Sequence, residues 1–227
     1  MHNDRGTLLA RLGHFTEARD DFIEAIKLAP DNHRYWHDGL MPLLLELGEL
    51  DEFQKRLVQE LAQFKTTTDG EAAHRVAKDA LCIPLEGDQL KTAMELADRA
   101  LALLQDNHRR SWAFQTKGMA EYRSGHYQDA IRSLEDQKRL TGDLKFQAEA
   151  NLFIAMCYER LGDHARAQAQ LNDALHTIQV DLPNPGEDLP FPDWIICDVN
   201  RREAEALING QGPSTRPAAT TQGVGLN

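Results

Sequence analysis

The pattern closest to a metal site is a pair of histidines, His33 and His37, four positions apart with Asp38 beside them. Two histidines one helical turn apart can share a helix face and hold zinc. The pair follows Pro30, however, at a point where a helix is expected to begin, and no third ligand is evident. We therefore interpret both as solvated histidines at a helix start, with zinc binding as the alternative.

Nucleophilic catalysis has less support in this sequence. His74 and Cys82 are eight residues apart, which is about 12 Å along a helix and too far for a thiolate–imidazole pair. The sequence contains no Gly-x-x-x-x-Gly-Lys phosphate loop, no His-Glu-x-x-His and no Cys-x-x-Cys. We interpret Cys82, Cys157 and Cys197 as buried helical residues rather than disulfide partners or metal ligands. We therefore predict a protein that is not an enzyme and carries no cofactor and no metal.

Charge and composition limit the class of partner. The chain carries 25 Lys and Arg against 36 Asp and Glu, a formal net charge of −11. Nucleic acids and anionic membranes attract clustered positive charge, so neither is expected as a partner. No apolar run is long enough for a signal peptide or a membrane span. We expect a cytoplasmic protein whose partner is a protein or a peptide.

A repeated glycine organises the chain. Leu12-Gly13, Leu47-Gly48 and Leu161-Gly162 share one turn signal, and Gly87 and Gly125 complete the series. The intervals are 35, 39, 38 and 37 residues, near the period of roughly 34 that paired-helix repeats show. Glycine suits the left-handed conformation that ends a helix. The series predicts five helix pairs stacked side by side.

The first unit shows how such a pair would pack. Ala18 and Ala25 are small enough to let two helices approach closely. Phe15 and Phe22 can fill the space between them, and Pro30 stands where the second helix should end. The fourth and fifth units repeat this pattern, whereas the second and third are degenerate.

From residue 1 to residue 178 this pattern resembles the tetratricopeptide repeat family. The resemblance implies an all-α fold, a right-handed α-solenoid of about five antiparallel helix pairs. It also implies a concave groove, lined by the first helix of each pair, in which an extended peptide lies. On this reading the chain is a non-catalytic scaffold for protein–protein interaction.

The degenerate units contain prolines that should disturb their first helices. Pro42 and Pro84 each remove a backbone hydrogen bond, which costs about 3 kcal/mol unless the helix bends. We expect kinks at both positions, which either widen the groove around Cys82 or reflect drift in a tolerant scaffold. Thr68-Asp69-Gly70-Glu71 has the form of a capping box and marks a helix start after a linker at 65–70.

The C-terminal part divides at its prolines. Residues 179–208 form a Pro-rich connector and a capping helix, which Asp193 should begin and which runs to about Leu207. This helix should cover the fifth unit; the alternative is that Trp194 and Ile195 bind a partner. Residues 209–227 lack apolar periodicity and should be disordered.

The resemblance assigns groove positions to residues of this chain. Trp112 and Met156 either contact the partner or pack between repeats, and both interpretations remain open. The charged positions would steer a partner, and the apolar ones would anchor it. The residues assigned to the partner-binding groove are Arg11, Asp38, Arg75, Lys78, Trp112, Gln115, Met119, Tyr122, Arg123, Met156, Glu159 and Arg160.

Two further roles follow from the ends of the array. The first helix begins without a polar capping repeat, so Leu8 and Leu9 would leave one side uncovered, which favours self-association through this helix pair. Residues 193–207 also resemble the close of tetratricopeptide regions in large bacterial proteins with kinase or β-propeller domains upstream. The alternatives are thus an oligomerisation module, or the scaffold end of a larger bacterial signalling protein.

Overall fold

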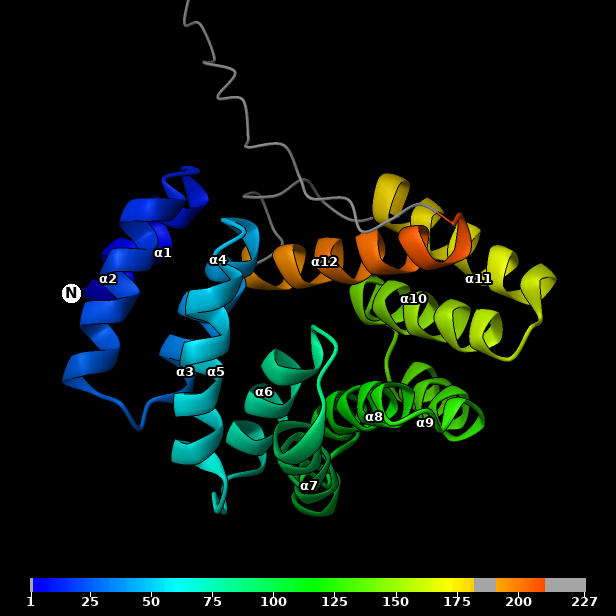
Figure 1. Cartoon of the computed structure of the whole chain (residues 1–227), viewed down its shortest axis with the longest axis horizontal. Helices are drawn as coiled ribbons and strands as arrows, with labels where there is room; N and C mark the ends of the chain where they lie inside the picture. Colours follow the sequence, from blue (N-terminus) through cyan, green and yellow to red (C-terminus); the bar gives the residue numbers. More distant parts are fainter. Residues whose placement is uncertain (1, 182–190, 211–227) are drawn as a thin grey trace, which may run out of the picture.

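The computed structural model describes residues 2–181 and 191–210. In these ranges the regular structure is helical and no strand occurs (Figure 1), which confirms the all-α prediction. Most of the Pro-rich connector (182–190) and of the tail (211–227) lies outside the described residues, so the predictions for both segments stay predictions.

The helices pair in chain order: α1 with α2, α4 with α5, α6 with α7, α8 with α9 and α10 with α11. A short helix and a π-helical turn precede α4. In chain order the helical elements are α1 (His2–Arg11), α2 (Phe15–Leu28), α3 (His33–Tyr35), η1 (Trp36–Leu40), α4 (Met41–Glu46), α5 (Leu50–Phe64), α6 (Gly70–Leu81), α7 (Gly87–Leu103), α8 (Asn107–Arg123), α9 (Tyr127–Leu140), α10 (Leu144–Arg160), α11 (His164–His176), η2 (Thr177–Asp181) and α12 (Phe191–Ile208).

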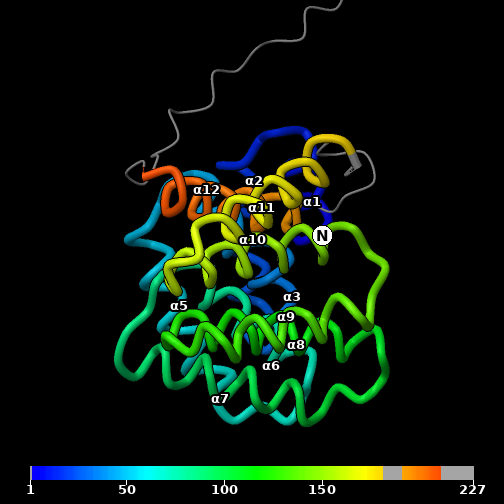
Figure 2. The backbone as a smooth tube through the Cα atoms, turned by 90° about the vertical axis from the view of Figure 1, so that its right-hand side faces the viewer, coloured from blue at the N-terminus to red at the C-terminus, as the bar shows by residue number. Residues whose placement is uncertain are grey.

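The five pairs follow an arc, and α12 lies across its open side (Figure 1). We call the inner side of this arc, formed by α4, α6, α8 and α10, the concave face. The view turned by 90° shows α12 beside α10 and α11 (Figure 2). The helix therefore packs on the fifth pair, as expected, but it also continues to α4 and η1 at the other end of the arc.

Close approach within each pair depends on small residues. A Cβ atom on Gly118 of α8 would lie 2.5 Å from Leu134 Cγ of α9, a distance that real Cβ atoms do not reach. Ala130 on the same face of α9 is fully buried. The turn that joins the two helices contains Gly125 with φ at +81°, a conformation that glycine adopts without strain. The positions of glycine and alanine thus determine how closely the two helices of a pair approach.

The second unit is distorted where the sequence predicted a kink. Pro42 lies in the first turn of α4 and cannot donate a backbone hydrogen bond. The preceding turn is π-helical, with the Met41 amide donating to the Trp36 carbonyl, five residues back. Within this turn Gly39 leaves room for Phe22, whose Cδ1 would be 2.3 Å from a Cβ at that position. The irregular turn lets the first two units interlock.

Three local predictions were wrong in detail. Pro84 lies between α6 and α7, so it bends no helix. The start of α6 is confirmed, but its N-cap is Asp69 rather than Thr68, because the Asp69 carboxylate accepts from the Glu71 and Ala72 amides. Asp193 does not cap α12, which already begins at Phe191.

Candidate interaction surface

The centre of the concave face is a buried ion pair with an amide beside it. Lys78 of α6 places its Nζ 3.0 Å from Glu149 Oε2 of α10. Gln115 of α8 donates its side-chain amide to the same Glu149 oxygen. Burial disfavours a charged amine, yet the Glu149 and Asp193 carboxylates outweigh it and raise the Lys78 pKa above its ordinary value. The ion pair and the Gln115 amide together thus join the first helices of the third, fourth and fifth units.

A second set of buried polar groups lies between the second and fourth units. His37 Nδ1 is 2.7 Å from Asp79 Oδ1, and His74 Nδ1 is 2.6 Å from Thr116 Oγ1. Burial, reinforced by Asp79, raises the Glu60 pKa well above its usual range, whereas burial and then Lys78 lower the His74 pKa. These groups are sealed from solvent, so their acid–base character serves packing rather than chemistry on a ligand.

The structure tests both interpretations of His33 and His37, as solvated histidines and as zinc ligands. His37 is buried and bonded to Asp79, so its interpretation as a solvated histidine was wrong. The His33 side chain is 13% exposed and lies 3.7 Å from Asp69. His37 is buried because it lies in the π-helical turn η1, which directs its side chain toward Asp79 of α6. Among residues 2–181 and 191–210, no group of three His, Cys, Asp or Glu side chains is arranged to hold a metal ion.

The three cysteines are buried, as the sequence predicted. Burial raises the pKa of the Cys157 thiol to about 12, and burial also raises the pKa values of Cys82 and Cys197. A thiol is nucleophilic as its thiolate. These side chains therefore act as small apolar residues of the core.

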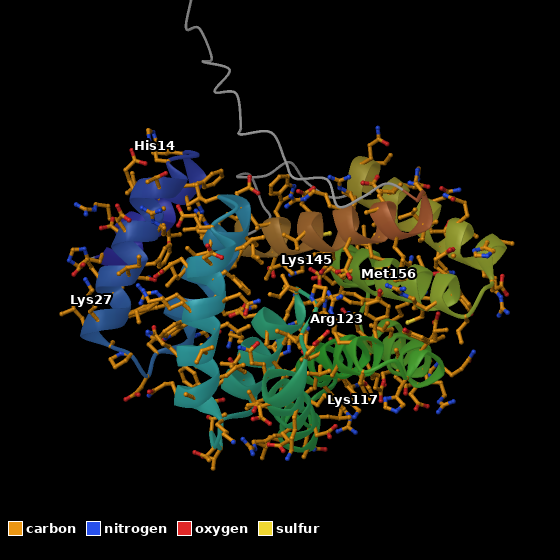
Figure 3. The ribbon with its side chains drawn as sticks, in the orientation of Figure 1. His14, Lys27, Lys117, Arg123, Lys145 and Met156 are labelled. Atoms are coloured by element: carbon orange, nitrogen blue, oxygen red, sulfur yellow. The ribbon has the colours of Figure 1, made fainter. Side chains whose placement is uncertain are left out.

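Ion pairs join α12 to the concave face. Arg123 of α8 donates to both carboxylate oxygens of Glu203, with Nη2 2.6 Å from Oε2, and its Nε donates to the Leu81 carbonyl at 2.9 Å. Lys145 Nζ at the start of α10 lies 2.7 Å from Asp193 Oδ2. Burial would raise the Asp193 pKa, but Lys145 and then Lys78 outweigh it and lower that pKa. Figure 3 shows Arg123, Lys145 and Met156 below α12.

The same helix presents apolar side chains to the concave face. Ile195, Ile196 and Cys197 are almost fully buried. Asn200 is also fully buried, yet neither its amide nitrogen nor its oxygen has a hydrogen-bond partner among the described residues. The contact surface of α12 is therefore a mixture of apolar packing, ion pairs and one unsatisfied polar side chain.

The structure places most of the predicted groove residues beneath α12 or inside the repeats. Lys78, Gln115, Met119, Tyr122 and Met156 are buried, and the Arg123 side chain is only 4% exposed. Packing is thus the arrangement seen for Met156. Trp112 is partly buried and stacks on His74, with ring centroids 5.9 Å apart.

Other predicted residues lie nearer to solvent. Arg75 is partly buried between Asp38 and Glu71, with which it forms ion pairs. Glu159 lies 2.9 Å from His164, and Arg160 is exposed at the far end of α10. Sequence reasoning missed that Asp193 and Glu203 of α12 complete this surface, because no spacing rule links a C-terminal helix to helices far back in the chain.

One part of the inner surface is left open by α12. A cleft of about 560 Å³ lies between α1, the α3–η1 segment and the start of α12. The predicted groove residues Arg11 and Asp38 both line it. Asp38 lies 3.7 Å from both Arg34 and Arg75, whereas Arg11 is exposed. The side chains that line it include Asn3, Thr7, Arg11, Tyr35, Asp38 and Phe191.

Comparison with known families identifies the repeats. Residues 1–32 and residues 116–179 match two models of the tetratricopeptide repeat. The chain contains tetratricopeptide repeats. The matched segments are the first unit and the fourth and fifth units, the same three that are most regular in sequence. No curated protein matches the chain.

Solved structures with the same fold agree with this assignment. A thermophilic tetratricopeptide protein of Thermus thermophilus is 20% identical with a TM-score of 0.57, covering 91% of this chain and 97% of that one. PilW, titled a widely conserved type IV pilus biogenesis factor, is 18% identical with a TM-score of 0.56, covering 93% and 92%. At this identity the likeness shows the α-solenoid fold alone. The resemblance to multidomain bacterial kinases stays a prediction.

Membrane insertion can be tested on the same helices. Within the described ranges, none combines the length with the apolar composition needed to cross a bilayer.

Proposed function

We propose that this chain is a non-catalytic scaffold that binds a segment of a partner protein on the inner side of its repeat arc. The observation that carries the proposal is the cleft between α1, the α3–η1 segment and α12, which Arg11 and Asp38 line. Tetratricopeptide repeats present such inner surfaces because stacked helix pairs form a curve. The buried polar groups elsewhere have no access to a substrate.

The chemistry of the cleft favours a segment with both polar and apolar side chains. Tyr35 offers a partly exposed aromatic ring, and Arg11 offers a cation to the partner. Asp38 carries the opposite charge and is 42% exposed. Aromatic anchors supply most of the affinity in such contacts, while charges select the partner and its direction.

A peptide-display selection against the full chain tests the proposal. Peptides captured by the wild type are measured again with an Arg11→Glu, Tyr35→Ala double variant, in which we expect at least a tenfold loss of affinity. The matched control is a Lys27→Glu, Lys117→Glu double variant, whose changes lie on the outside of the arc (Figure 3). Equal binding by a folded cleft variant would refute recognition in the cleft.

Self-association is the second candidate, and exposed leucines favour it. Leu8 of α1 and Leu12, in the turn directly after α1, are 57% and 64% exposed, while Leu9 packs against the core. Light scattering after size-exclusion chromatography measures the oligomeric state, and Leu8→Glu with Leu12→Glu should dissociate an oligomer. A wild-type monomer at high concentration would exclude this role.

Action in the bacterial cytoplasm, as the scaffold end of a signalling protein, is a further proposal from the sequence.

A further inference from the structure

The concave face and α12 have opposite charges at matching places. The face contributes Arg123 and Lys145, and the helix contributes Glu203 and Asp193, which pair with them. Asp193 and Glu203 are ten residues apart, about 15 Å along a helix. Lys78 adds a third cation, which interacts electrostatically with Asp193. The face therefore recognises a helix with carboxylates at two separated points.

The apolar part of the contact is incomplete. Ile195, Ile196 and Cys197 are buried against the solenoid, but Asn200 brings a side-chain amide into the contact without a partner among the described residues. Gln115 on the concave face likewise has an unpartnered side-chain oxygen. A helix with a better match at these positions would bind this face more tightly than α12 does.

The solenoid does not need α12 to connect its units. Each helix pair packs internally, and α9 with α10, α7 with α8 and α5 with α6 continue the contacts from pair to pair. The helix reaches across the arc instead, from α4 and η1 to α10 and α11. Its release would uncover the concave face while leaving the order of the pairs intact.

We infer that the concave face is a docking surface for an amphipathic α-helix of a partner protein, and that α12 occupies this surface until the partner helix replaces it. The partner helix carries an Ile- or Phe-rich face and carboxylates about ten residues apart, in the arrangement of Asp193 and Glu203. This inference rests on the proposed scaffold function and names the partner's chemistry. It differs from the extended peptide that the family resemblance implies.

A synthetic peptide with the sequence of residues 191–208 serves as the probe. It is labelled with a fluorophore and titrated into the full chain, and binding is measured by anisotropy. In an Ile196→Asp, Glu203→Arg variant, the added charges release α12, and we expect the peptide to bind at least tenfold more tightly than to the wild type. In the matched control, Glu205→Arg, affinity should stay at the wild-type value, because Glu205 pairs with Arg201 of α12 itself.

A charge exchange tests the register of the bound helix. The Arg123→Glu substitution, added to a chain in which Ile196→Asp alone releases α12, should weaken binding of the wild-type peptide. A peptide with Glu203→Arg should then recover most of the lost affinity. The inference is overturned if the released, folded chain does not bind the 191–208 peptide. It is also overturned if neither Arg123→Glu in the chain nor Glu203→Arg in the peptide changes the affinity.

Hydrogen exchange on the wild-type chain covers the case in which a released variant does not fold. We expect the amides of α12 to exchange together, at least tenfold faster than those of α8, α9 and α10, because α12 opens without the solenoid. Equal protection of α12 and these helices would overturn the inference. If the display peptides still bind the cleft in that case, the scaffold function stands and only the helix-exchange inference fails.

Discussion

The contact between α8 and α9 and the contact between α12 and the concave face are built differently. In the first, Gly118 and Ala130 let two helices approach so closely that a Cβ atom on Gly118 would collide with Leu134. In the second, ion pairs through Arg123 and Lys145 border an apolar stripe that includes the unpartnered Asn200. The first resembles a close-packed core and the second a protein–protein interface. The comparison indicates which contacts hold the fold and which can be exchanged.

The largest expected effect follows from damage to the close-packed contact. Leu134→Ala removes a fully buried side chain and should lower the free energy of unfolding by about 2–5 kcal/mol. Urea denaturation followed by circular dichroism measures it. Leu103→Ala, at a position 46% exposed, is the matched control and should change stability by less than about 0.5 kcal/mol. If both changes lowered the free energy of unfolding equally, the α8–α9 contact would not be the close-packed contact that holds the fold.

A smaller effect is expected from weakening the α12 contact. Glu203→Gln keeps a hydrogen-bond acceptor for Arg123 but removes the charge. Glu203 is 25% exposed, so the opening free energy of α12 should fall by about 1–2 kcal/mol, less than for a fully buried pair. Hydrogen exchange of the α12 amides measures this opening. Glu205→Gln, which removes a pair within α12, should cost about 0.3–0.5 kcal/mol.

Asn200 gives a prediction of opposite sign. Asn200→Leu replaces an unsatisfied buried amide with an apolar side chain of similar length, so it should stabilise the docked α12 by about 1 kcal/mol. The same change in the full chain should weaken binding of the 191–208 peptide, because the chain's own helix competes better. Slower exchange of the α12 amides would confirm the effect, and faster exchange would show that Asn200 makes a contact that matters.

The smallest effect depends on pH and tests the buried polar groups. His74 has a lowered pKa in the folded chain because of burial and Lys78, whereas the unfolded chain binds the proton near pH 6.5. Below that pH the unfolded state holds more protons, so stability falls as pH falls. Between pH 7 and pH 6 the loss is about 0.7 kcal/mol.

The control for this pH effect is His74→Gln, which lacks the titrating ring but can still bond to Thr116. Urea titrations of both proteins at pH 7 and pH 6 give the two slopes. The wild type should lose more stability than the variant over this interval. Identical pH dependence in the two proteins would mean that His74 does not contribute.

The repeats could be predicted from the sequence because their signals are local. Gly13, Gly48, Gly125 and Gly162 all have positive φ values, the conformation that follows a helix end, and each can be identified from its neighbours. The irregular turn before Pro42 follows from one missing amide. Pro84 and the capping residue of α6 were assigned wrongly, since boundaries depend on a few competing hydrogen bonds.

The sequence by itself determined the five helix pairs, because small residues at a fixed period leave two adjacent helices few other ways to pack. Only the tertiary structure decided what covers the inner side of the arc. Arg123 and Glu203 are 80 residues apart, and Lys145 and Asp193 are 48 apart. Such pairs form only when the curvature of the whole array brings distant helices together. This curvature is the sum of the small rotations between successive helix pairs, which no local sequence pattern encodes.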